Sequence, residues 1–346
     1  MTIRTRSVAR VAQFCRSGCP SSDQPDPKMP SVKPAMSYRW GADGQQHQLQ
    51  LVWVPGTGGE PYLFGRAPRQ KAIHIAGFHI PTTPVTQALW THVMATNPAA
   101  KQAPRCPVEN ISWGDITRPG GFLDQLNERV LPALVGNEPD LRFRLPSETE
   151  WEYAARGGPA WRDNFAFSGS NDPDEVAWYG PRWTAGRQLC VRLLGPHLGW
   201  RLAGRWPRRR QPTETHDVAS KAPNQLGLYD MSGNVWEWCE DVCTDDLSAV
   251  PTDGRPYVSA GVARRLRGGC HHNWDLHCRV FWRYGIDADA HDGCIGFRII
   301  LASKVAPAYQ ALETNEQPMA GAIGCEPLRT CEAVSVIPTL RPVRIQ

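Results

Sequence analysis

The stretch from Arg267 to Arg298 reads RGGCHHNWDLHCRVFWRYGIDADAHDGCIGFR, and the rest of the chain is organised around it. Its two ends, Arg267-Gly268-Gly269 and Ile295-Gly296-Phe297-Arg298, predict a rigid frame. Between them lies a tract rich in His, Asp, Cys, Tyr and Trp, which are residue types that serve catalysis, metal binding or recognition. The function of the protein depends on which of these roles the tract has.

Composition describes a folded protein without a strong electrostatic preference. The 346 residues suffice for one large domain or two small ones, and 41% hydrophobic with 21% charged residues can build a core. No apolar run approaches the roughly 18 residues that a membrane-spanning helix needs. A net charge of only +4 argues against the whole chain being a nucleic-acid or membrane binder. Fourteen Trp residues are typical of a loop-rich core.

The N-terminal sequence has no apolar stretch of about 7–15 residues and therefore does not predict a secretory signal. In that context the eleven cysteines are expected to be thiols rather than a disulfide framework. We therefore expect a cytoplasmic protein by default, with no membrane segment.

The polar and Pro-rich ends bracket the predicted domain. Residues 1–37 predict a disordered leader, and residues 304–346 predict a loose Pro-rich tail. Structure is expected to begin at residue 48, with alternating strand patterns over 48–55 and 71–80. The domain is therefore predicted to span residues 48–303.

Two helices are predicted in the first half of this domain. One begins after Thr86, whose hydroxyl can cap the first backbone N–H groups, and ends before Asn97. The other covers about 114–131 and is broken or bent by Pro119-Gly120-Gly121.

A third helix has a clear start signal. Ser147 is followed three residues later by Glu150, which is the spacing of a capping box. Glu148, Glu150 and Glu152 could be read as catalytic carboxylates, but helix-dipole and capping roles explain these acidic residues better.

An Arg-rich segment covers residues 181–211, with eight Arg and no acidic residue. Such a patch could hold a phosphate backbone. Gly, Pro and Trp interrupt it, however, and it carries no nucleic-acid-binding motif. It is therefore interpreted as a solvated surface insertion, and nucleic acid is not the expected partner.

Residues 221–241 contain a candidate cation site. The four positions Asp230, Gly233, Val235 and Glu237 offer two carboxylates and two backbone carbonyls, and oxygen ligands suit a hard cation such as Ca²⁺. A tight turn in which Asp230 bonds its own backbone explains the pattern equally well.

Five ordered motifs between about Leu51 and Ser303 resemble the formylglycine-generating enzyme, or sulfatase-modifying factor, family. They read PVTQALWTHVMATNP, CPVENISWGDI, RFRLPSETEWEYAARGG, APNQLGLYDMSGNVWEWCED and RGG…IGFR. The resemblance implies an α+β domain with a C-type-lectin-like fold, mostly irregular, with short antiparallel strands and two helices. It also favours a structural Ca²⁺ held by the segment from Asp230 to Glu237.

One function known in this family is the O₂-dependent oxidation of a peptide cysteine with a linear copper(I) pair of cysteines. The resemblance places these two positions at Asn273 and Cys278, so the first thiol is missing, although Cys270 could substitute if the loop refolded. One thiol and one amide do not supply the soft ligand pair that Cu(I) needs. This oxidoreductase remains the alternative prediction.

A second function in the family is that of the variable proteins of diversity-generating retroelements, in which Asn codons become NNY codons. These codons cannot encode Lys, Glu, Gln, Met or Trp. None of the five occurs at the 19 positions 270–273, 275–278 and 284–294. These residues make up roughly a fifth of ordinary usage, so their absence has a chance of about a few per cent. The pattern favours a diversified, non-enzymatic binding protein.

Codon randomisation also explains the metal-ligand types in the tract, because His and Asp are single-base changes from Asn. It therefore weakens a transition-metal reading of the cluster His271, His272, Asp275, His277, Asp287, Asp289 and His291. We expect no catalytic cofactor and a protein or other macromolecular ligand. The predicted ligand-binding residues are His271, His272, Asn273, Asp275, Leu276, His277, Phe281, Tyr284, Ile286, Asp287, Asp289, His291 and Asp292.

Overall fold

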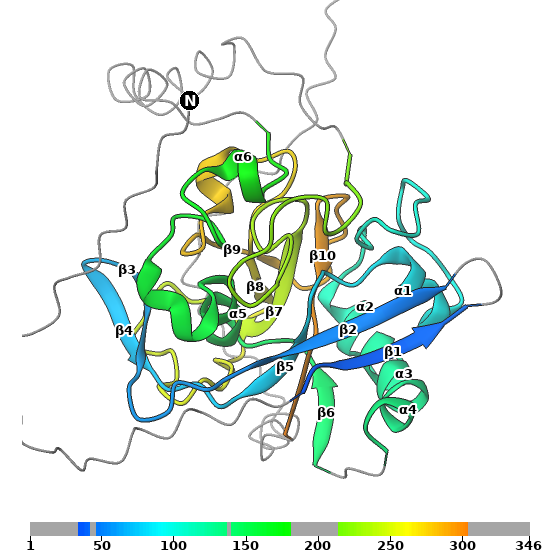
Figure 1. Cartoon of the computed structure of the whole chain (residues 1–346), viewed down its shortest axis with the longest axis horizontal. Helices are drawn as coiled ribbons and strands as arrows, with labels where there is room; N and C mark the ends of the chain where they lie inside the picture. Colours follow the sequence, from blue (N-terminus) through cyan, green and yellow to red (C-terminus); the bar gives the residue numbers. More distant parts are fainter. Residues whose placement is uncertain (1–33, 42–45, 137–139, 181–213, 304–346) are drawn as a thin grey trace, which may run out of the picture. The chain divides into compact units, whose positions relative to one another are not determined.

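The computed structural model describes residues 34–41, 46–136, 140–180 and 214–303 (Figure 1). The predicted leader up to residue 33, the Arg-rich segment 181–211 and the tail 304–346 lie outside the described residues. Within the described part, no helix is long and apolar enough to cross a membrane.

A five-stranded sheet joins the beginning and the end of the domain. Its order is β1 (Met36–Trp40), β2 (His47–Val54), β5 (Phe78–Pro81), β11 (Ile300–Ser303) and β6 (Leu141–Arg144), and all neighbours are antiparallel. Strand β2 confirms the alternation in the sequence. Strand β1 corrects the predicted start of the domain, because the chain is already a strand at Met36 and pairs with β2 as a hairpin.

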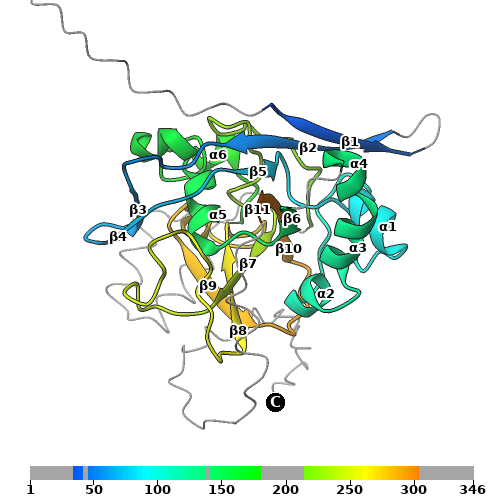
Figure 2. The same ribbon diagram turned by 90° about the horizontal axis from the view of Figure 1, so that it is seen from below.

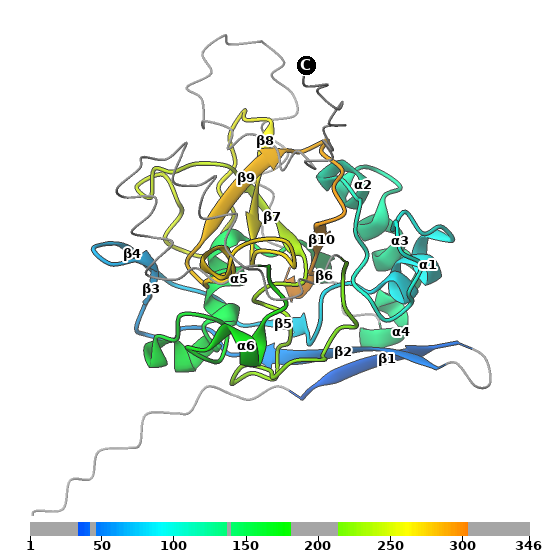
Figure 3. The same cartoon turned by 90° about the horizontal axis from the view of Figure 1, so that it is seen from above.

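A four-stranded sheet carries the stretch around which the chain is organised. Its order is β10 (Ile295–Phe297), β7 (Trp236–Val242), β8 (Ala263–Arg267) and β9 (Arg283–Asp287). Strand β10 is parallel to β7, and the other pairs are antiparallel. Both ends of the stretch from Arg267 to Arg298 are therefore fixed in, or next to, the same sheet. Figures 2 and 3 show β8 and β9 on the side of the domain away from β1 and β2.

The predicted strand over residues 71–80 is two strands. A small hairpin pairs β3 (Tyr62–Arg66) with β4 (Arg69–Ile73), and the chain leaves it before β5 begins. The alternation continues across this break, so the sequence pattern alone does not reveal it.

The helices of the first half are confirmed. Helix α1 (Gln87–Met94) begins after Thr86, whose hydroxyl accepts the backbone N–H of Leu89 at 3.2 Å. The predicted break separates α2 (Trp113–Thr117) from α3 (Phe122–Arg129), and α4 (Leu131–Val135) follows.

Helix α5 (Glu148–Ala155) has the predicted capping box: the Ser147 hydroxyl accepts from Glu150 N–H, and the Glu150 carboxylate accepts from Ser147 N–H. The single-turn elements η1 (Gly158–Asp163), α6 (Pro173–Val176) and η2 (Asp275–Cys278) complete the helical structure of the described residues. The fold therefore has short helices beyond the two that the resemblance implies, and its α+β class is confirmed.

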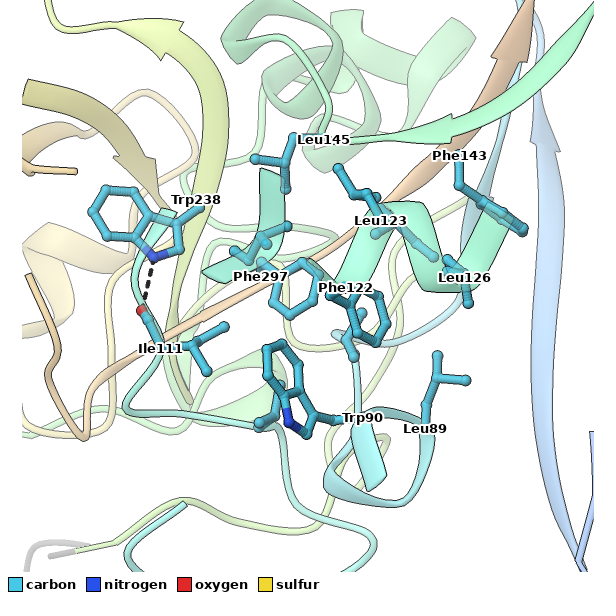
Figure 4. Packing of buried hydrophobic residues seen from close by; sticks show 14 of the residues in the cluster. Leu89, Trp90, Ile111, Phe122, Leu123, Leu126, Phe143, Leu145, Trp238 and Phe297 are labelled. Carbon is cyan, nitrogen blue, oxygen red and sulfur yellow. Dashed lines mark hydrogen bonds between the residues drawn. The ribbon is translucent and has the colours of Figure 1, made fainter. Parts of the chain in front are cut away.

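Aromatic side chains hold the main core. Phe122 stacks on Trp90 with ring centres 5.1 Å apart and meets Phe297 edge-on at 5.0 Å (Figure 4). The indole of Trp238 donates to the carbonyl of Ile111 at 3.1 Å, so a loop is attached to β7 from inside the core (Figure 4). Phe297 thus anchors the end of the Arg267–Arg298 stretch among the helices.

Candidate functional site

Arg267 fixes the start of the stretch. It is the last residue of β8, it is fully buried, and its guanidinium pairs with Glu152 and donates to the carbonyls of Val280 (2.8 Å) and Trp282. The guanidinium also lies 5.1 Å from the ring centre of Trp151. The buried side chain of Arg267 therefore fixes the backbone of residues 280–282 by hydrogen bonds to two of its carbonyls.

Two glycines turn the chain out of β8. Gly268 and Gly269 have φ angles of 95° and 75°, a region that side chains disfavour. A Cβ on Gly269 would lie 2.7 Å from the sulfur of Cys278, so this position has no room for a side chain. The two glycines bring the rest of the tract back against β8.

Arg298 fixes the far end. Its guanidinium makes two bonds to the carboxylate of Glu237, at 3.0 and 3.1 Å, and donates to the carbonyls of Pro81 and Tyr229 at 2.8 Å. With Gly268, Gly269, Gly296 and Phe297, the two arginines form a buried frame, as the sequence predicted. We call residues 270–294 between these ends the central tract.

The structure brings most of the predicted ligand-binding side chains to the surface, but not all. His271 and Asp275 are only 2% and 5% exposed. The exposed side chains are those of His272, Asp287, Asp289, His291 and Asp292, and the half-buried ones are those of Asn273, Leu276, His277, Phe281, Tyr284 and Ile286. Their roles in binding stay predictions.

The half-buried members pack onto the domain. The ring of Tyr284 lies 5.4 Å from that of Trp236, and the ring of His277 lies 4.8 Å from that of Trp282. Burial lowers the pKa of His277 to about 4, so this imidazole is neutral at pH 7. The guanidinium of Arg66, from the β3–β4 hairpin, lies 4.9 Å from the ring centre of Phe281.

The last part of the tract, residues 288–293, is fixed against the segment that precedes and begins α2. The carbonyls of Asp292 and Ala288 accept from the N–H groups of Asn110 (3.1 Å) and Trp113 (2.9 Å). A ring nitrogen of His291 lies 2.8 Å from the carboxylate of Asp115. Backbone contacts therefore hold this loop, and its exposed side chains have no part in those two bonds.

The positions that match the copper-binding pair do not fit that role. The side-chain oxygen of Asn273 accepts from the N–H and the thiol of Cys270, both at 3.2 Å. Cys278 is fully buried, and its sulfur lies 4.0 Å from the carbonyl of Trp274. Burial, with a smaller effect of Asp275, raises the pKa of the Cys278 thiol far above its ordinary value. Neither position offers a ready thiolate.

The two carboxylates of the predicted calcium site already accept hydrogen bonds from the protein. Both oxygens of Glu237 accept from Arg298, and one also accepts from the indole of Trp151 at 2.6 Å. The oxygens of Asp230 accept from Ala219 N–H at 2.8 Å and from the amide of Asn234 at 3.4 Å. Burial raises the pKa of Asp230 to about 6. All four carboxylate oxygens thus already have protein donors, and one donor is a cation.

A group of metal-ligand side chains that the sequence analysis missed lies where the two ends of the central tract meet. Among the described residues, this group consists of Cys270, His271 and Cys294, whose ligand atoms all lie within 4.8 Å of one another. Cys270 and Cys294 are 24 positions apart in the sequence, and neither this spacing nor their residue type predicts that they lie close together. The seven His and Asp residues considered from sequence do not form such a group there.

Fold and site together define an α+β scaffold that presents a loop tract between two buried, arginine-anchored ends. The chain belongs to the family of proteins with a sulfatase-modifying factor enzyme 1-like domain, whose family model matches residues 40–303.

The relatives that this chain resembles include both a chaperone protein and an enzyme. The chain is 35% identical over 192 residues to the chaperone protein LppX of Paenibacillus barcinonensis, covering 49% of this chain and 64% of that protein. It is 32% identical over 201 residues to the formylglycine-generating enzyme of Streptomyces coelicolor, covering 56% and 52%. The matches thus span between half and two thirds of these relatives.

A solved structure shares the fold. Treponema denticola variable protein 1 superimposes with a TM-score of 0.57 at 23% identity, covering 76% of this chain and 98% of that one. This likeness concerns the fold alone.

Proposed function

We propose that this protein is a non-enzymatic ligand-binding protein that displays a diversified surface, residues 271–294, on its lectin-like scaffold, as in the variable protein of a diversity-generating retroelement. The observation that carries the proposal is the separation of frame from surface. The frame residues are buried and ion-paired, whereas five of the predicted contact side chains are exposed and six are half-buried. Such side chains can change without removing the contacts that hold the frame.

The composition of the tract supports the same conclusion. None of the residues that NNY codons exclude occurs at the 19 positions examined, and the fold is that of a variable protein from Treponema denticola. His, Tyr and Phe side chains offer contact area at a modest cost in conformational entropy, as antibody loops do. The ligand that this surface suits is a protein or another macromolecule.

The rival function is that of the formylglycine-generating relatives, an oxidase that acts on a peptide cysteine with copper and O₂. The family and the Streptomyces coelicolor relative favour it. The two positions that match the copper-binding cysteines argue against an oxidase. Asn273 stands in place of one thiol, and the Cys278 thiol is buried with a strongly raised pKa.

A genomic observation and an enzyme assay test the proposal. We expect, beside a reverse-transcriptase gene, a near-copy of the DNA for residues 270–298 that differs only at adenines. We also expect that the chain, loaded with copper under reducing conditions, does not oxidise a sulfatase-type cysteine peptide. Turnover that disappears in Cys278→Ser would overturn the proposal and establish the oxidase.

A further inference from the structure

Two thiols and two imidazoles meet at the point where the central tract begins and ends. The ligand atoms of Cys270, His271 and Cys294 lie within 4.8 Å of one another, and Nδ1 of His272 lies 3.1 Å from the sulfur of Cys294. The rings of the two histidines are 4.1 Å apart. Four donors of the kinds that zinc prefers are therefore gathered in one place.

The backbone holds these residues from both sides. Cys270 N–H donates to the side chain of Asn273, and His271 N–H donates to the carbonyl of Asn234 at 3.0 Å. Cys294 is fixed by its own carbonyl, which accepts from Trp236 N–H at 2.7 Å. The donors thus lie on two segments, one just after β8 and one just before β10. Both segments are hydrogen-bonded to the chain at the start of β7.

His271 is oriented as a metal ligand usually is. Its Nδ1 lies 2.8 Å from the carbonyl oxygen of Asn234, and because a carbonyl only accepts, Nδ1 carries the proton. The lone pair is then on Nε2, which is the arrangement found when a backbone carbonyl orients a ligating imidazole.

We propose that Cys270, His271, His272 and Cys294 bind a Zn²⁺ ion that links the two ends of the central tract. Tetrahedral zinc has Zn–S distances of about 2.3 Å and Zn–N distances of about 2.0–2.1 Å. Three of the donors, those of Cys270, His271 and Cys294, already lie within 4.8 Å of one another. His272, whose Nδ1 is 3.1 Å from the sulfur of Cys294, lies outside that group and would turn in as the fourth ligand.

Charge and protons balance in this site. Each thiol loses its proton when its sulfur binds, so one Zn²⁺ replaces two H⁺, and the two thiolates neutralise the ion. Cys270 is 1% exposed and Cys294 is half-buried, so a neutral assembly is needed at this depth.

The zinc site rests on the positions of the four side chains and stands whether or not the tract is diversified. Randomised codons would account for the residue types, and they would not determine what these residues do once the fold brings them together. This site also differs from the family's thiol pair, because it uses neither Asn273 nor Cys278 as a ligand. Zinc here would order the entrance and the exit of a binding loop, which lowers the entropy lost on binding a ligand.

Cobalt substitution of the full chain tests the site. The reduced, chelator-treated protein is titrated with Co²⁺ and then with Zn²⁺ in competition with a chromogenic zinc chelator. We expect one ion per chain, thiolate-to-cobalt charge-transfer absorption, the strong visible bands of tetrahedral Co²⁺, and displacement by Zn²⁺. Cys294→Ser should weaken the charge-transfer band, because only the Cys270 thiolate remains, and lower zinc affinity about tenfold or more. His272→Asn should weaken zinc by a similar factor and keep both thiolates.

Cys243→Ser is the matched control, because Cys243 is also half-buried but lies outside the group. It should keep the full cobalt spectrum and zinc affinity. A wild-type chain without the tetrahedral cobalt spectrum would overturn the proposal. So would a cobalt spectrum and a zinc affinity that are unchanged in Cys294→Ser.

Discussion

At the scale of single residues, buried ion pairs fix the position of the central tract. The carboxylate of Glu148 accepts two bonds from Arg283, at 2.6 and 2.7 Å, and lies near the guanidinium groups of Arg265 and Arg267. Glu152 pairs with both Arg156 and Arg267. The sequence predicts only helix-dipole and capping roles for these two glutamates. Arg283 lies 135 positions from Glu148, and Arg267 lies 115 positions from Glu152, so no local pattern reveals these pairs. The pair of Glu152 with Arg156, four residues on, is the local exception.

Glu148 should dominate the stability of this region. We predict that Glu148→Gln lowers the free energy of unfolding at pH 7 by about 3–5 kcal/mol, because it leaves buried arginines without their counter-charge. Urea unfolding measures the loss. Glu128→Gln, at an exposed helix position, is the control and should change stability by no more than about 0.5 kcal/mol.

The same prediction has a pH dependence. Burial opposes ionisation of Glu148, but Arg265 and Arg283 outweigh it and lower its pKa from 4.5 to about 2. Its stabilisation is therefore complete above about pH 4.5 and is lost as the pH falls towards 2. The difference between wild type and Glu148→Gln should shrink over that range. A difference that stays constant from pH 6 to pH 3 would show that the charge of Glu148 is not the cause.

At the scale of elements, local signals predicted what local interactions build. The capping residues Thr86 and Ser147, and the break at Pro119, set the helix limits within a few residues. Strand β1 was missed because it is only five residues long and directly follows a polar, Pro-rich segment. Its Met36, Tyr38 and Trp40 alternate on a half-buried face, and pairing with β2 completes the strand. The attachment of the loop 288–293 to α2 joins segments about 175 positions apart and has no local signal.

Asp115 connects that loop to α2, because it completes the helix's capping box with Ser112 and also accepts from His291. We predict that Asp115→Ala and Ser112→Ala each cost about 1 kcal/mol of stability. Only Asp115→Ala should also speed amide hydrogen exchange over residues 289–292, since it alone removes the His291 contact. Exchange that rises equally in both variants would mean that the helix cap, and not this contact, holds the loop.

At the scale of the whole molecule, the sequence predicted the fold through five ordered motifs and predicted the frame through its glycines and arginines. It did not predict which tract residues are buried, because His271 and Asp275 have the same residue types as their exposed neighbours. It also did not predict the contact between Cys270 and Cys294, which exists only once β8 and β10 flank β7.

The occupied carboxylates predict that calcium does not stabilise this chain. An ion present at a hundredfold its dissociation constant would add about 2.7 kcal/mol and raise the melting temperature by several degrees. We expect equal melting temperatures with and without added CaCl₂, since Glu237 is already paired with Arg298. A calcium-specific rise that disappears in Asp230→Asn would contradict this and restore the cation site.

Because the frame residues are buried and the surface residues are exposed, replacing them should have very different effects on the free energy of unfolding. The quadruple replacement of Asp287, Asp289, His291 and Asp292 by Ser, all exposed, should cost no more than about 2 kcal/mol in total. The single change Arg267→Ala should cost about 3–5 kcal/mol or prevent folding, because it removes one of the two cations paired with buried Glu152 and releases the backbone of residues 280–282. Urea unfolding of both variants, with circular dichroism to confirm the native state, compares the two losses. A surface variant that loses as much stability as Arg267→Ala would mean that these side chains are part of the structure, and that a replaceable binding surface is not what the tract provides.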